Sequence, residues 1–184
     1  QRGLRVTALD TFARGDTTLA ASAHNPNFSP VKGDTRDEDL IKSLLKTADL
    51  VIPLAAIVGA PLCKLDPIAA RTINLDAIQM ILKHMSPSQR IIYPTTNSGY
   101  GVGQKDIYCT EETPLNPISL YGVTKMKAER AILDRGNGIT LRLATVFGMA
   151  PRMRIDLLVN DFTWRAVTDR AVVIFEGHAK RNYI

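Results

Sequence analysis

The sequence has few metal-binding or disulfide-forming residues. It contains only two cysteines, Cys63 and Cys109, and three widely separated histidines. Neither cysteine has a partner at a metal-ligand spacing, and no His-Glu-x-x-His motif is present. We therefore expect neither a metal site nor a disulfide framework, and the low cysteine content indicates a reducing, cytoplasmic setting.

Long apolar runs and aromatic residues are also scarce. No apolar run approaches the ~18 residues that a membrane-spanning helix needs, so no membrane partner is expected. The net charge is +5, and aromatic residues make up 6% of the chain. Basic residues without interleaved aromatics do not form the stripe typical of nucleic-acid-binding proteins. The charge instead favours a small anionic ligand.

Segments with strand-like and helical spacing alternate along the chain. This alternation predicts a Rossmann-like α/β fold, a doubly wound parallel sheet covered on both faces, with ligands at the carboxyl ends of its strands. In the helix expected over 66–85, Asp66 is a plausible N-cap and Pro67 stands at the first helical position. The expected strands are 5–9, 49–55, 90–94, 139–144 and 171–175, and the expected helices are 36–47, 66–85, 119–135 and 156–168.

The chemistry-bearing motif is Tyr121-Gly-Val-Thr-Lys125 in the helix expected over 119–135. Residues four apart share one helix face, so the ammonium is expected to lower the pKa of the phenol and prepare it for proton transfer. Such a pair also arises by chance, with an interfacial tyrosine and a solvated lysine. Thr96, just past the strand expected over 90–94, adds a hydroxyl that can bind the same substrate oxygen.

With these residues, the sequence resembles the extended short-chain dehydrogenase/reductases, specifically the NAD-dependent nucleotide-sugar epimerase/dehydratase family. The signatures are Leu9-Asp10, Gly33 to Asp37, Leu54 to Ala56, the catalytic set Thr96, Tyr121 and Lys125, and Lys180 to Ile184. The resemblance implies that NAD is the cofactor and that Asp10 binds the adenosine ribose. It also implies adenine contacts from Asp34 and Thr35, and cofactor contacts from Leu54, Ala55 and Ala56. Tyr121 and Lys125 would contact NAD as well.

The resemblance also implies a mechanism and a substrate. Tyr121 would take a proton from a sugar hydroxyl while hydride passes to NAD, with Thr96 orienting the oxygen. Arg181 would grip the diphosphate of a nucleotide sugar. Ser98, Thr145 and Arg154 are further candidates for substrate contacts. For Ser98, a turn hydrogen bond is favoured over a weak proton relay, and Arg154 equally suits a solvated loop.

Three departures from the family pattern qualify this interpretation. The glycine-rich phosphate loop and the first strand are missing, so we expect 1–184 to be an incomplete NAD-binding domain, a fragment that binds NAD poorly by itself. Residues 150–184 are expected to lead into a truncated substrate-binding part. Asn97 and Ser98 stand where dehydratases carry acids, which favours epimerisation. Thr145 stands where epimerases of the family commonly have an asparagine that contacts the substrate, so the identity of the nucleotide sugar stays open.

Three functions therefore remain. The first is an NAD-dependent nucleotide-sugar epimerase that works through a transient keto intermediate. The second is an NAD(P)-dependent reductase or dehydrogenase acting on a nucleotide sugar, and the third is a non-catalytic binding protein with the same fold. A homodimer is also expected through the helices at 66–85 and 119–135. The apolar residues assigned to its interface are Ile68, Ile73, Ile78, Ile81, Ala128 and Ile132.

Overall fold

The structure is a computed structural model that describes residues 3–15, 17–102, 108–175, 177 and 178. The chain divides into two compact units. One unit consists of Gln1–Val6, Phe12–Phe28 and Leu143–Ile184, and the other of Thr7–Thr11 and Ser29–Arg142. We call them the terminal unit and the central unit, and each is described by itself.

The strands of the central unit form two small sheets. In the first, β1 (Val6–Asp10) pairs with β2 (Phe28–Lys32). In the second, the order is β3 (Leu50–Val51), β4 (Arg90–Thr96) and β5 (Gly138–Leu143). β3 runs parallel to β4, with Leu50 opposite Arg90. Parallel strands joined by helices confirm the predicted α/β class.

Three of the helices between these strands begin at a capping side chain. Asp37 caps α1 (Glu38–Leu45), and Ser119 caps α5 (Leu120–Arg135). The single helix expected over 66–85 consists of three consecutive pieces, and Asp66 caps the first, as predicted. They are α3 (Pro67–Arg71), the π-helix η2 (Thr72–Asp76) and α4 (Ala77–His84), preceded by a short α2 (Ala60–Leu65).

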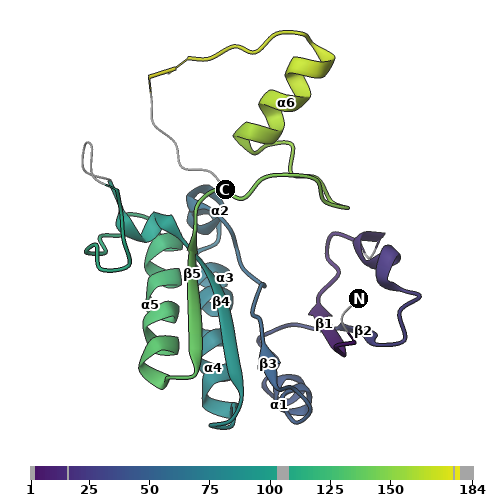
Figure 1. The fold of residues 1–184 in the computed structure, drawn as a ribbon. Helices are drawn as coiled ribbons and strands as arrows, with labels where there is room; N and C mark the ends of the chain where they lie inside the picture. The colour runs from purple at the N-terminus through teal and green to yellow at the C-terminus, as the bar shows by residue number, and fades with distance from the viewer. Residues whose placement is uncertain (1–2, 16, 103–107, 176, 179–184) are drawn as a thin grey trace. The chain divides into compact units, whose positions relative to one another are not determined.

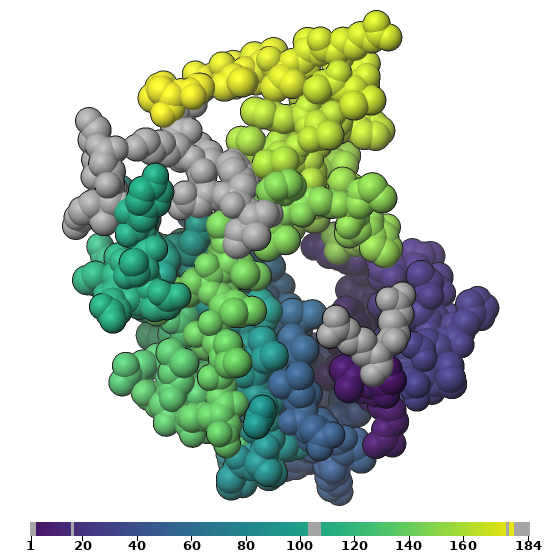
Figure 2. Space-filling model, in the orientation of Figure 1, coloured from purple at the N-terminus to yellow at the C-terminus, as the bar shows by residue number. Residues whose placement is uncertain are grey.

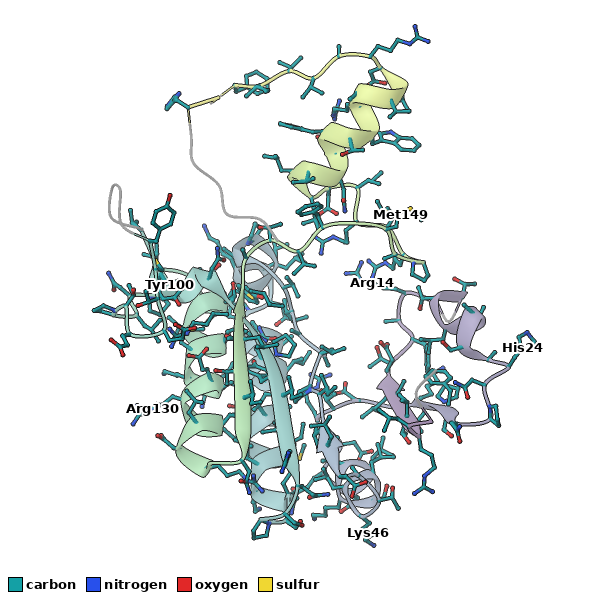
Figure 3. All side chains as sticks on the ribbon, in the orientation of Figure 1. Arg14, His24, Lys46, Tyr100, Arg130 and Met149 are labelled. Carbon is teal, nitrogen blue, oxygen red and sulfur yellow. The ribbon has the colours of Figure 1, made fainter. Side chains whose placement is uncertain are left out.

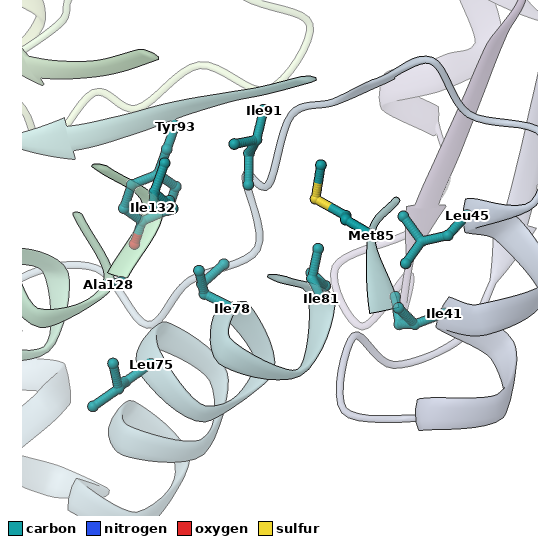
Figure 4. Close-up of a cluster of buried hydrophobic side chains, with 10 residues drawn as sticks. All are labelled: Ile41, Leu45, Leu75, Ile78, Ile81, Met85, Ile91, Tyr93, Ala128 and Ile132. Atoms are coloured by element: carbon teal, nitrogen blue, oxygen red, sulfur yellow. The ribbon is translucent and has the colours of Figure 1, made fainter. Parts of the chain in front are cut away.

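One hydrophobic core holds the helices to β4 (Figure 4). Ile91 and Tyr93 point from β4 towards the helices, as expected for residues two apart on a strand. The cluster consists of Ile41, Leu45, Leu75, Ile78, Ile81, Met85, Ile91, Tyr93, Ala128 and Ile132. Four residues expected at a dimer interface therefore lie in the core instead, namely Ile78, Ile81, Ala128 and Ile132. In Figure 1, α4 and α5 run beside β4 and β5.

The second face of the three-stranded sheet is less covered than the sequence predicts. Ile139 and Leu141 on β5 are 59% and 42% exposed, whereas Arg142 reaches a side chain of α5. Because alternate strand residues point to opposite faces, the two apolar residues lie on the face away from α5. Within the central unit, the described helices bury only one face.

The terminal unit contains the 3₁₀ helix η1 (Thr17–Ser22) and α6 (Leu158–Thr168). The prediction of a last strand over 171–175 is wrong, because these residues form no helix or strand in the structure. A strand requires a neighbour for its backbone N–H and C=O groups, and none of the described strands pairs with this segment. The sequence pattern also missed β2, α2 and η1.

Candidate active site

Thr96 ends β4 and begins the turn that carries the proposed chemistry. It is the N-cap of the 3₁₀ helix η3 (Asn97–Tyr100), and its hydroxyl accepts a hydrogen bond from the backbone N–H of Ser98. The same hydroxyl donates to the Ser98 Oγ at 3.1 Å. The interpretation of Ser98 as a turn residue is therefore confirmed. Two adjacent hydroxyls, rather than a carboxylate, define this end of β4.

Glycine allows the turn to approach the helix that carries the tyrosine. A Cβ added at Gly99 would lie 2.2 Å from the Met126 Sδ on α5. At Gly122, the residue after Tyr121, an added Cβ would lie 3.1 Å from the carbonyl oxygen of Ser98. Glycine at both positions brings η3 against the first turns of α5.

Tyr121 stands in the first turn of α5 and is partly buried. Burial raises the pKa of its phenol above the ordinary value, hydrogen bonding with Thr96 acts to lower that pKa, and the neighbouring Cys63 acts to raise it. The net direction is upward. In this state the Tyr121 side chain is a protonated phenol at neutral pH, and therefore a proton donor.

The lowering of the Tyr121 pKa by Lys125 stays a prediction, because the contacts of the ammonium in this structure are with β4. The ammonium donates a 2.8 Å hydrogen bond to the carbonyl oxygen of Pro94 and lies 3.9 Å from the centroid of the Tyr93 ring. Burial lowers the pKa of Lys125 to about 8, while Glu129 acts in the opposite direction. The backbone and ring of β4, rather than the Tyr121 phenol, hold the ammonium. Four-residue spacing brought the two side chains to one face without making them partners.

The acids predicted to bind the adenosine part of NAD lie at the ends of adjacent strands. Asp10 ends β1, and its carbonyl oxygen accepts a 3.0 Å hydrogen bond from the N–H of Gly33, which follows β2. Asp34 is held by Arg36, whose Nε donates to Oδ1 at 2.9 Å and whose Nη2 donates to Oδ2 at 2.5 Å. This hydrogen-bonded pair lowers the pKa of Asp34. Thr35, between them, is half-buried.

The loop after β3 is shaped by a residue that the sequence interpretation missed. Leu54 and Ala55 are exposed and Ala56 is half-buried, as residues available to a ligand. The next residue, Ile57, donates to the Asn74 Oδ1 at 2.8 Å and accepts from the Asn74 Nδ2 at 2.9 Å. Asn74 is 1% exposed and lies in the π-helix η2. An amide flanked by apolar residues, in Ile73-Asn74-Leu75, is the sequence signal that could have indicated it.

Apart from Ser98, which lies in the central unit, the described residues predicted to contact the substrate belong to the terminal unit. Thr145 is half-buried there. Arg154 pairs with Asp156 at 2.7 and 2.6 Å, so its charge is already balanced within the unit. The buried Asn160 accepts from the N–H of Gly148 and donates to the carbonyl oxygen of Arg154, which fixes the intervening loop. Arg181 lies outside the described residues.

The described part of the chain contains His, Cys, Asp and Glu side chains and several helices. No group of three or more His, Cys, Asp or Glu side chains there is arranged to hold a metal ion. No helix in the same residues has the length and apolar content required to cross a bilayer.

The chain is similar in sequence to sugar-nucleotide epimerases. It is 31% identical over 167 residues to a Bacillus subtilis protein named as an uncharacterized UDP-glucose epimerase, and the match covers 85% of this chain and 51% of the relative. It is 30% identical over 192 residues to UDP-glucuronate 4-epimerase 3 of Arabidopsis thaliana, covering 89% of this chain and 44% of the relative. The chain thus spans about half the length of the curated relatives it matches.

Solved structures give the same fold. The UDP-glucuronic acid 4-epimerase of Bacillus cereus, solved with UDP-glucuronic acid and NAD, matches with a TM-score of 0.80 at 26% identity. That match covers 97% of this chain and 60% of the epimerase. A dTDP-glucose 4,6-dehydratase of Streptomyces venezuelae matches with a TM-score of 0.82 at 22% identity, covering 98% of this chain and 58% of the dehydratase. The fold is therefore shared by epimerases and dehydratases.

A sequence model of one protein family matches the whole chain. The family model for the NAD dependent epimerase/dehydratase family matches residues 1–184. This chain belongs to the NAD-dependent epimerase/dehydratase family.

Proposed function

We propose that the protein is an NAD-dependent epimerase that acts on a nucleotide sugar through a transient keto intermediate. The observation that carries this proposal is the hydroxyl pair of Thr96 and Ser98 next to Tyr121. Residues 96–100 include no acid, whereas dehydration requires a second proton-transfer group at this turn. The site therefore suits a reversible oxidation and reduction at one carbon.

The proton transfers are assigned to side chains of the central unit. Bound NAD would accept a hydride from the sugar carbon and return it. Tyr121 exchanges the proton of the sugar hydroxyl, and Thr96 holds the same oxygen by a hydrogen bond. Because the pKa of Tyr121 is raised here, the phenol is protonated near neutral pH and holds the proton that the ketone oxygen takes up when hydride returns. Acting as a base requires additional positive charge beside the phenol, which Lys125 or the nicotinamide ring would supply.

The residues of the central unit fit NAD. Asp10, Asp34 and the 54–56 loop follow β1, β2 and β3, and Thr96 ends β4, so the candidates share the carboxyl ends of the strands. The Asp10 carboxylate would bind ribose hydroxyls and disfavour a 2′-phosphate. We propose residues 1–184 as the NAD-binding domain, with 150–184 leading into the substrate-binding part.

A nucleotide sugar is the proposed substrate class. Relatives named for UDP-glucose and UDP-glucuronate support this class, and the net charge of +5 suits a diphosphate. Thr145, Arg154 and Arg181 are the proposed contacts. For Arg154, phosphate binding must compete with Asp156, whose pKa the pair lowers to about 2.

Tyr121→Phe tests the proposed chemistry. We expect turnover of UDP-glucose or UDP-glucuronate to fall by at least about a hundredfold with substrate affinity nearly unchanged. Tyr108→Phe is the matched control, since Tyr108 is 95% exposed and should be silent. Full activity in Tyr121→Phe would refute the assignment. Net release of NADH during turnover would instead select the reductase or dehydrogenase, and absence of turnover in the wild type would favour a binding protein.

We also propose a cytoplasmic homodimer. Free Cys63 and Cys109 support a reducing compartment. The outer sides of α3, η2 and α5 support a helical interface, because Ile68 is 77% exposed and a hollow of about 210 Å³ lies between these helices. That hollow is lined by Arg71, Leu75, Leu120, Val123, Thr124 and Lys127. A monomeric mass by light scattering would contradict the dimer.

A further inference from the structure

A buried ion pair joins α5, the helix that carries Tyr121 and Lys125, to β5. The Glu129 side chain is 2% exposed and that of Arg142 16%. The Nε and Nη2 of Arg142 donate to the same oxygen of Glu129, Oε1, at 2.8 and 2.7 Å. Glu129 follows Lys125 by four residues, so both side chains lie on one face of α5. A carboxylate is thus fixed one helical turn from the proposed catalytic lysine.

The same arginine holds the segment that follows the Thr96 turn. Its Nη1 donates to the Tyr100 hydroxyl at 3.2 Å and to the carbonyl oxygen of Glu111 at 3.0 Å, and the guanidinium lies 5.3 Å from the centroid of the Tyr100 ring. The Tyr100 hydroxyl in turn donates to the carbonyl oxygen of Thr110 at 3.0 Å. Figure 3 labels Tyr100 near the beginning of α5, and Figure 2 shows the teal residues that follow η3 beside the green residues of α5.

The pair leaves one carboxylate oxygen without a partner. The Glu129 Oε2 is buried and makes no hydrogen bond within the described part of the chain. Pairs of arginine and carboxylate are frequently bidentate, with each carboxylate oxygen accepting one hydrogen bond. An unpaired buried oxygen costs about 1–3 kcal/mol. Arg142 balances the carboxylate through Oε1 alone, so the side of Glu129 without a hydrogen-bond donor is left to interact with the charged groups around it.

We propose that Glu129, held in place by Arg142, is a positioning residue for Lys125 that keeps the ammonium charged within the buried site. The proposal rests on the proposed function, in which Lys125 supplies positive charge beside Tyr121. The charged and titratable groups that interact with the lysine are Tyr93 on β4 and Glu129 on α5. Tyr121 interacts in turn with Tyr93, and Arg142 with Glu129. Of these groups, Glu129 is the one that raises the pKa of Lys125 against burial.

Glu129→Gln is the primary test, because it removes the charge while preserving the shape. We expect NMR of ¹³Cε-labelled lysines to show the Lys125 titration midpoint at lower pH than in the wild type, with Lys125→Met assigning the signal. The alkaline limb of the kcat profile should move to lower pH in the same direction, because the charged lysine is the active form. At pH 8, kcat should fall about tenfold. An unchanged Lys125 midpoint would overturn the proposal.

A double variant separates positioning from stability. Glu129→Leu with Arg142→Met removes both buried charges, so the thermal midpoint should recover towards the wild-type value relative to Arg142→Met alone. The kcat loss should persist, since the carboxylate is absent. Recovery of kcat together with stability would show a merely structural pair and overturn the proposal.

Controls distinguish this proposal from the proposed function. Asp134→Asn breaks the Arg130–Asp134 pair on the exposed side of the same helix and should change neither the Lys125 midpoint nor kcat. Figure 3 labels Arg130 on this outer side. If the wild type turns over no nucleotide sugar, the proposed function fails, yet the Lys125 titration in Glu129→Gln still decides the role of Glu129.

Discussion

The ammonium of Lys125 lies 3.9 Å from the centroid of the Tyr93 ring, between a π-face and the carbonyl oxygen of Pro94. A cation so placed gains a cation–π contact and a charge-assisted hydrogen bond. It is also 5% exposed and loses most of its hydration. The consequence is a lysine whose pKa is near 8, a value that makes its charge sensitive to mildly alkaline pH.

Lys125→Met should alter the pH dependence of stability. Burial lowers the pKa of Lys125 from 10.5 to about 8, so the folded chain releases this proton before the unfolded chain does. Between these values the unfolded state binds more protons, and the lysine's contribution makes the free energy of unfolding rise with pH. The variant lacks this contribution and should be more stable at pH 7 by about 1–3 kcal/mol, less what the Pro94 hydrogen bond contributes.

Urea unfolding of both proteins from pH 7 to 10.5 measures this effect. The raised pKa values of Cys63, Tyr93 and Tyr121 reduce stability at alkaline pH in both proteins, so the difference between the two isolates the lysine. If the extra free energy of unfolding of Lys125→Met does not shrink as the pH rises, the assignment of Lys125 as a buried, charged lysine is contradicted.

Thr96→Val and Thr95→Val should separate two adjacent hydroxyls on β4. Thr96→Val removes the N-cap of η3 and the contact with Ser98, so it should cost about 1–2 kcal/mol and reduce turnover at least about a hundredfold. The Thr95 Oγ1 is buried without a hydrogen-bond partner in the described structure. Thr95→Val should therefore be neutral or slightly stabilising, with turnover retained. Equal losses of activity in the two variants would refute this distinction.

Gly101→Ala should disrupt the end of the Thr96 turn. Gly101 has φ +71°, and an added Cβ would lie 2.1 Å from the carbonyl oxygen of Asn116. The left-handed backbone and the clash together should cost about 3 kcal/mol or more. Gly136 has a similar φ of +76° with open space around it, so Gly136→Ala should cost only about 1 kcal/mol. Thermal melting compares them, and equal losses would mean that the clash relaxes without cost.

Asn74→Leu should loosen the loop proposed to contact NAD. It removes both hydrogen bonds to Ile57 while keeping the branched shape of the side chain, which should cost about 2–3 kcal/mol and weaken NAD binding about tenfold. Gln79→Leu is the control, because Gln79 is an exposed amide in the same run of helices. Calorimetry and thermal melting measure the two effects. Unchanged NAD affinity in a destabilised Asn74→Leu would restrict the residue to a structural role.

Local sequence signals predicted much of this protein. Asp66 and Ser119 mark the beginnings of α3 and α5 because a capping side chain acts on backbone groups three residues away. The alternation of strands and helices predicted the α/β class, and the motif at Tyr121 and Lys125 led to the family. Local signals failed at 171–175, because a strand also needs a partner outside its own segment.

Tertiary structure decided which groups of the proposed site contact one another. Lys125 donates to the carbonyl oxygen of Pro94, 31 residues earlier in the sequence. The hydrogen bonds between Asn74 and Ile57 join residues 17 apart in the sequence, and the ion pair of Glu129 and Arg142 joins residues 13 apart. Such contacts depend on how β4, β5 and the helices pack, and burial in that packing sets the pKa values of Tyr121 and Lys125. Residue types and spacing identified the chemical groups, and the packed core determined their partners and their charge.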